Sequence, residues 1–67
     1  MNIQVPQHRT IRVPVMVFGE DQDGIPQVLS KNYVLTKEQL EQKVHHASAE
    51  REATANGFIV TRVVDAI

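Results

Sequence analysis

Residues 36–57 read TKEQLEQKVHHASAEREATANG, and this stretch decides the fold because it is the only long helix that the sequence predicts. Thr36 is suited to the N-cap of a helix, and Gln39, three residues later, is its capping-box partner. Gly57 suits the left-handed position that follows the last turn of many helices. We therefore expect one continuous helix between these two caps.

The predicted helix has a thin apolar stripe. At helical spacing the stripe carries Leu40, Val44, Ala47, Arg51 and Ala55. The opposite side carries Glu38, Gln42, His45, His46, Ala49 and Ala53. We expect the stripe to face a sheet, with the stem of Arg51 over the sheet edge and its guanidinium in water, or paired with Asp65, Glu52 or a second subunit.

Strand patterns lie on both sides of the predicted helix. Residues 9–18, RTIRVPVMVF, alternate so that Ile11, Val13, Val15 and Val17 share one face. Residues 19–24, GEDQDG, predict a hairpin turn, and residues 25–35 predict a second strand with a bulge around residues 30–32. A third strand begins at residue 58. Pro14 lacks a backbone N–H, so it predicts a free edge or a bulge near the middle of the first strand.

These elements predict a small α+β domain of order ββαβ, with a mainly antiparallel three-stranded sheet and the helix on one face. A right-handed crossover places the third strand parallel to the second, beside either the first or the second strand. We favour the order 2-1-3, because the first strand is the most apolar. One helix covers only one face of a sheet, so either Met16, Phe18, Val28 and Val34 or the strand residues of opposite parity need a different cover.

Length and composition limit the functional classes. The 67 residues fit a single domain, residues 1–67, and contain no cysteine, so neither disulfides nor thiolate zinc sites supplement a small core. The net charge of -1 gives no general attraction to nucleic acid or anionic membranes. The sequence shows no signal peptide and no long apolar run, which favours a cytoplasmic protein without membrane contact. Residues 1–8 indicate an extended arm or a short extra strand.

Two clusters raise a metal hypothesis. Neighbouring helix positions point about 100° apart, so His45 and His46 are not expected to chelate one ion, and their possible partners Glu41 and Glu50 supply only one further ligand each. The turn residues Glu20, Asp21 and Asp23 resemble a fragment of a calcium loop but lack its other ligands and its flanking helices. We therefore expect no metal and no cofactor, and interpret the turn as solvated or as an acidic contact surface for a basic partner.

The sequence contains no motif that identifies a family or an enzymatic reaction, and the pair Ser48 and His45 lacks a third orienting group. The excess of apolar strand surface favours a small non-enzymatic protein-protein interaction module that binds through an apolar sheet face or edge and self-associates as a homodimer. Its small size and lack of motifs are typical of inhibitors or adaptors from phages and mobile elements. Its partner-binding residues are predicted to come from a single set: Arg12, Met16, Phe18, Glu20, Asp21, Asp23, Tyr33, His45, His46 and Arg51. The alternative is a small nucleic-acid-binding regulator that uses a basic patch around Arg9 and Arg12, with Lys31 or Arg62 beside it and Tyr33 to stack on bases.

Overall fold

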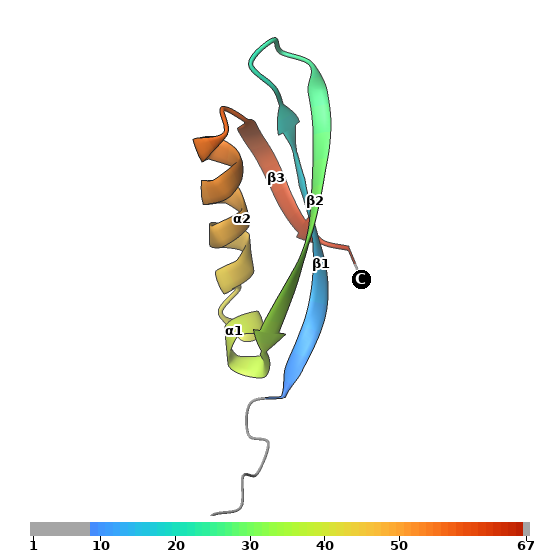
Figure 1. Ribbon diagram of the computed structural model, residues 1–67, viewed down its shortest axis with the longest axis vertical. Coiled ribbons are helices and arrows are strands. Elements are labelled where there is room, and N and C mark those ends of the chain that lie inside the picture. Colours follow the sequence, from blue (N-terminus) through green and yellow to red (C-terminus); the bar gives the residue numbers. More distant parts are fainter. Residues whose placement is uncertain (1–8, 67) are drawn as a thin grey trace, which may run out of the picture.

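The computed structural model describes residues 9–66, so the arm expected at residues 1–8 lies outside the described residues. In chain order the elements are β1 (Thr10–Glu20), β2 (Pro26–Thr36), α1 (Lys37–Glu41), α2 (Val44–Ala55) and β3 (Ile59–Asp65). The three strands form one antiparallel sheet, and both helices lie on one face of it (Figure 1). The predicted α+β class is confirmed, with one short helix more than expected.

The strand order is β2-β1-β3, as predicted, with β1 in the centre. Its pairing with β2 runs unbroken from Thr10 opposite Thr36 to Glu20 opposite Pro26. The carbonyl oxygen of Pro14 accepts a hydrogen bond from the N–H of Ala66 at 2.8 Å. The N–H and C=O of one strand residue point to the same side of the strand. The N–H that proline lacks would therefore have pointed towards β3, not towards β2. The proline therefore costs β1 no bond to β2.

The predicted bulge at residues 30–32 is wrong, because β2 keeps a regular register against β1 along its whole length. The irregularity lies instead between β1 and β3, where Phe18 pairs with Arg62 but Gly19 pairs with Val60. Thr61 is thus the extra residue of a bulge. Its hydroxyl donates to the carbonyl oxygen of Phe18 at 3.0 Å and holds the bulge against β1.

The single helix predicted between Thr36 and Gly57 is wrong in its middle. The capping box at Thr36 and Gln39 forms as expected, but α1 ends at Glu41 and Lys43 adopts a left-handed conformation with φ of 55° before α2 starts. The predicted end is confirmed: Gly57 has φ of 85°, its N–H bonds to the carbonyl of Thr54, and the N–H of Phe58 bonds to the carbonyl of Ala53. These two bonds are those of a Schellman cap.

The break turns α2 so that a different face meets the sheet. His45, Ala49 and Ala53, which were expected to face away, are buried, whereas Val44, Ala47, Arg51 and Ala55 of the expected stripe are exposed. Only Leu40, which lies before the break, packs against the core as predicted. Ala49 and Ala53 have small side chains, so α2 lies close to the valine-rich face of β1. The buried apolar side chains form one cluster: Val13, Val15, Val17, Leu35, Ala49, Ala53 and Phe58.

Candidate functional site

The sheet face opposite the helices is apolar in its middle, and no element within residues 9–66 covers it (Figure 1). We call it the open face. Alternation along each strand and the strand register place a defined set of apolar residues on it: Pro14, Met16, Phe18, Pro26, Val28, Val34, Ile59 and Val64. Val34 and Ile59 keep 61% and 59% of their surface exposed. The structure thus confirms that Met16, Phe18, Val28 and Val34 receive no cover from the helices.

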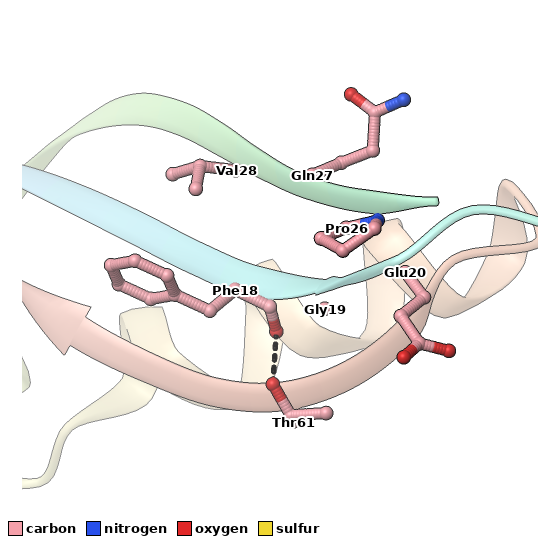
Figure 2. Close-up of a pocket in the computed structure, with 7 residues that line it drawn as sticks. All are labelled: Phe18, Gly19, Glu20, Pro26, Gln27, Val28 and Thr61. Atoms are coloured by element: carbon pink, nitrogen blue, oxygen red, sulfur yellow. Dashed lines mark hydrogen bonds between the residues drawn. The ribbon is translucent and has the colours of Figure 1, made fainter. Parts of the chain in front are cut away.

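Phe18 is one of the residues that line a shallow hollow on the open face. Figure 2 shows its ring beside Val28 of β2, with Pro26 and Glu20 towards the hairpin and Thr61 on β3. The hollow has a volume of about 480 Å³. The guanidinium of Arg62 lies 4.6 Å from the centre of the Phe18 ring, which is the distance of a cation–π contact. The hollow therefore offers an aromatic and aliphatic floor with one cation at its border.

Two opposite charges flank this apolar region along β1. Arg12 and Glu20 belong to the same alternating set as Met16, which lies midway between them, and both are exposed. Four predicted partner-binding residues, Arg12, Met16, Phe18 and Glu20, therefore share the open face.

The other predicted residues lie elsewhere. Asp21 and Asp23 belong to the hairpin turn, and the Asp21 carboxylate is occupied within it: Oδ1 accepts from the backbone N–H groups of Asp23 and Ile25, and Oδ2 accepts from the side chain of Gln27. Arg51 is exposed on the outer face of α2, so its predicted position over the sheet edge is wrong.

The basic patch of the alternative hypothesis is divided between the two faces. Lys31 belongs to the helix side of β2 and forms an ion pair with Glu52 at 2.7 Å. Tyr33 also lies on the helix side, partly buried against the core, so the open face lacks the aromatic residue that was expected to stack on bases. Arg12 and Arg62 share the open face but lie apart on it, because Arg62 pairs with Phe18, six residues along β1 from Arg12.

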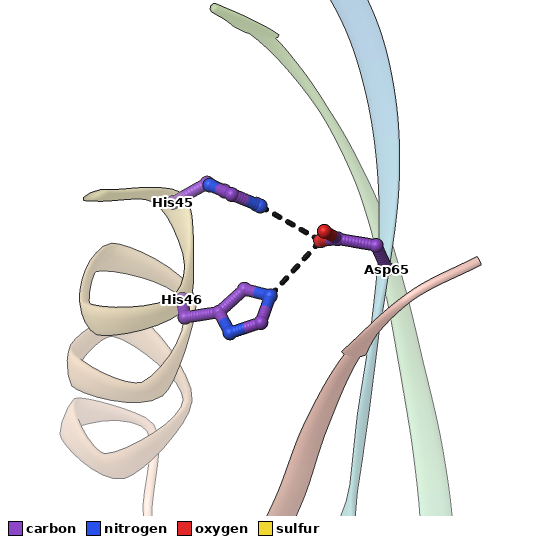
Figure 3. A group of neighbouring side chains, drawn as sticks. All are labelled: His45, His46 and Asp65. Carbon is purple, nitrogen blue, oxygen red and sulfur yellow. Dashed lines mark hydrogen bonds and ion pairs between the residues drawn. The ribbon is translucent and has the colours of Figure 1, made fainter. Parts of the chain in front are cut away.

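A second cluster lies on the helix side, where the first turn of α2 meets the end of β3. Nε2 of His45 and Nε2 of His46 lie 2.7 Å and 2.9 Å from the same oxygen, Oδ1 of Asp65 (Figure 3). The two imidazole rings meet edge to face, with centroids 4.5 Å apart. The two adjacent histidines thus point at one atom despite their spacing along the helix, and their partner is Asp65 rather than Glu41 or Glu50.

The contacts decide the charge state of Asp65. Burial raises the pKa of its carboxyl, but hydrogen bonds from His46 and His45, together with their electrostatic attraction, outweigh burial and hold the pKa below its usual value. An ionised carboxylate only accepts hydrogen bonds, so each Nε2 carries a proton that it donates to Asp65.

Within residues 9–66, two buried side-chain polar atoms lack a hydrogen bond: Nδ1 of His45 and the hydroxyl oxygen of Tyr33. Their rings are neighbours, with centroids 6.3 Å apart. Buried polar atoms without hydrogen-bond partners are uncommon in folded proteins, and they often mark strain, a ligand site or a bound water or ion.

Sequence reasoning missed the role of Asp65. The topology contains the signal, because β3 runs back towards the start of the helix, so the residue that ends β3 comes near the first turn of α2. Asp65 is the only acidic residue in β3. Without the helix break at Lys43, however, His45 would have been placed on the solvent side.

A comparison with models of protein families, with curated proteins and with solved structures finds no match for this chain. Within residues 9–66, no helix has the length and apolar character needed to cross a membrane.

Proposed function

We propose that this chain is a small, non-enzymatic protein-binding module that self-associates through its open face. The observation that carries the proposal is an uncovered apolar sheet face that has Arg12 at one end and Glu20 at the other. Contiguous exposed apolar surface on a soluble domain is characteristic of an interaction site.

The size of the core favours a second copy as the occupant. The buried apolar cluster on the helix side has seven members, of which two are alanines. A domain of this length buries only about 60% of the surface of its unfolded chain, and it contains no cysteine for a disulfide. Burial of Met16, Phe18 and Val28 against another copy would add a second apolar layer to the sheet.

The charges define how two copies would pack. In a two-fold dimer the same patch faces itself. With the axis parallel to the two sheets and across the strands, Met16 of one copy faces Met16 of the other, and Arg12 of each copy faces Glu20 of its partner. Two sheets packed in this way lie about 10 Å apart with their strands nearly aligned. The open face is therefore complementary to itself in charge as well as in apolar character.

Sedimentation equilibrium at several protein concentrations tests the proposal. We expect a reversible dimer, and we expect Arg12→Glu or Glu20→Arg alone to raise its dissociation constant at least about tenfold, since each reversal replaces two attractions with two repulsions. The double variant Arg12→Glu with Glu20→Arg should restore dimerisation. Lys37→Glu, an equal charge change at the start of α1 on the helix side, is the matched control.

Three outcomes would count against this function. A wild-type chain that is monomeric at all concentrations would refute self-association, and single variants that dimerise as well as wild type would refute the arrangement. A salt-dependent affinity for a DNA duplex or an RNA strand that Arg12→Ala removes would instead support the nucleic-acid alternative.

A further inference from the structure

We propose that His45, His46 and Asp65 form a binding site for a divalent transition-metal ion, with zinc as the best-fitting ion. The site lies on the helix side of the sheet, so it is independent of the proposed self-association through the open face. It would use the two imidazole Nε2 atoms and one oxygen of the Asp65 carboxylate.

The geometry is close to that of a bound ion. One ligand atom from each of the three residues lies within 4.8 Å of the other two. Zinc holds histidine nitrogen and carboxylate oxygen at about 2.0–2.2 Å, which places tetrahedral ligand atoms about 3.3 Å apart. The observed separations of Nε2 from Oδ1, 2.7 Å and 2.9 Å, therefore need to widen by only about half an ångström.

The three side chains surround the site unequally. The side chain of His45 is fully buried, whereas those of His46 and Asp65 keep 24% and 26% of their surface exposed. One ligand is therefore fixed by the core, and two lie at an opening to solvent. Three protein ligands with an accessible fourth position are the pattern of zinc sites that bind water or a small ligand.

The chemistry of the donor set selects the class of ion. Two imidazole nitrogens and one carboxylate oxygen suit zinc, cobalt, nickel and copper, whereas calcium and magnesium prefer sites made of oxygen atoms alone. With neutral imidazoles the three side chains carry one negative charge, which partly offsets that of a divalent ion.

The unpartnered Nδ1 of His45 is consistent with this assignment. When Nε2 binds an ion, the proton of a neutral imidazole moves to Nδ1, and that N–H usually donates to a second group that orients the ring. The buried hydroxyl of Tyr33, which also lacks a partner, is the candidate acceptor for such a bond, because the Tyr33 and His45 rings are neighbours. Metal binding would thus give both atoms a hydrogen-bond partner, which they lack in the metal-free contacts.

Calorimetric titration of the metal-free chain with zinc, and with cobalt to record its visible absorption, tests the site. We expect one ion per chain, and we expect His46→Gln and Asp65→Asn each to weaken binding at least about 100-fold, because direct ligands matter at least as much as the groups that orient them. His46 is preferred to His45 for substitution because it is only partly buried. Circular dichroism confirms that each variant is folded.

Two matched controls separate this site from adventitious binding. His8→Gln removes the third histidine of the chain, and Glu50→Gln neutralises an exposed carboxylate of α2; both should bind zinc like wild type. In the wild-type chain, zinc should shift the ring-proton resonances of His45 and His46 but not those of His8. No zinc binding by wild type, equal losses in the control variants, or shifts confined to His8 would overturn the proposal.

Discussion

Nε2 of His45 lies 2.7 Å from Oδ1 of Asp65, and this contact joins the first turn of α2 to the last residue of β3. His45 is the only polar residue buried in the part of the chain that the structure describes. Its side chain is fully buried, and Nε2–H of His45 donates to Asp65. The contact therefore ties the first turn of α2 to the end of β3.

The first prediction follows from this burial. In metal-free buffer, Asp65→Ala should lower the free energy of unfolding by about 1–3 kcal/mol, because it leaves the buried Nε2–H of His45 without an acceptor. Urea titration monitored by circular dichroism measures the loss. Glu52→Ala, which breaks the exposed ion pair with Lys31, is the control and should cost much less. Equal losses in the two variants would show that the burial of His45 does not determine the effect.

The sequence predicted this part of the molecule only in pieces. The caps at Thr36 and Gly57 were correct because each depends on neighbouring residues alone. The break between α1 and α2 was missed, since Gln42 and Lys43 are ordinary helix formers and neither glycine nor proline marks the position. The buried face of α2 was missed for the same reason. In a continuous helix, Val44 and Ala47 share a face with Leu40, so His45 was expected to face away from the sheet.

The second prediction concerns the break itself. Lys43→Gly should raise the free energy of unfolding by about 0.5–1 kcal/mol. The left-handed conformation costs a residue with a side chain about 1–2 kcal/mol, and glycine avoids this cost. The greater conformational freedom of glycine in the unfolded chain cancels part of the gain. Thermal unfolding checks the sign. Lys37→Gly, in the first turn of α1, is the opposite control and should destabilise the chain. A loss of stability in Lys43→Gly would mean that the lysine side chain contributes more than its backbone strain costs.

The sheet was predicted more completely than the helices. Alternation in β1 depends on a two-residue period that Pro14 does not disturb, and the order β2-β1-β3 follows from placing the most apolar strand in the centre. The bulge was misplaced because it depends on a contact between strands. Gly19 and Thr61 lie 42 positions apart in the sequence, and only the fold brings them to the same irregularity.

The third prediction tests that irregularity. A Cβ on Gly19 would overlap the carbonyl oxygen of Ile59 and would lie 2.7 Å from Cε2 of Phe58, so the backbone of β3 has to move to accept it. Gly19→Ala should cost about 3 kcal/mol, at the upper end for overpacking. In Gly24→Ala, in the hairpin turn, the new Cβ would have no atom within 4 Å. The only cost is the backbone strain of an alanine at φ of 77°, about 1 kcal/mol. Equal midpoints in urea for the two variants would contradict the predicted clash.

The last prediction concerns pH and the hairpin turn. Hydrogen bonds from the N–H of Ile25, the side chain of Gln27 and the N–H of Asp23 hold the pKa of Asp21 below its ordinary value of 3.8. Because the folded pKa is depressed, the stabilisation from Asp21 is fully present well above pH 3.8 and is lost as pH falls through the lower folded value. Asp21→Asn should therefore be less stable than wild type near neutral pH, and the difference should shrink in acid. Urea unfolding at a series of pH values measures it, with Asp23→Asn as the control for removing a charge from the same turn. A difference between Asp21→Asn and wild type that stays constant down to the lowest pH at which both chains fold would contradict the proposed role of the carboxylate.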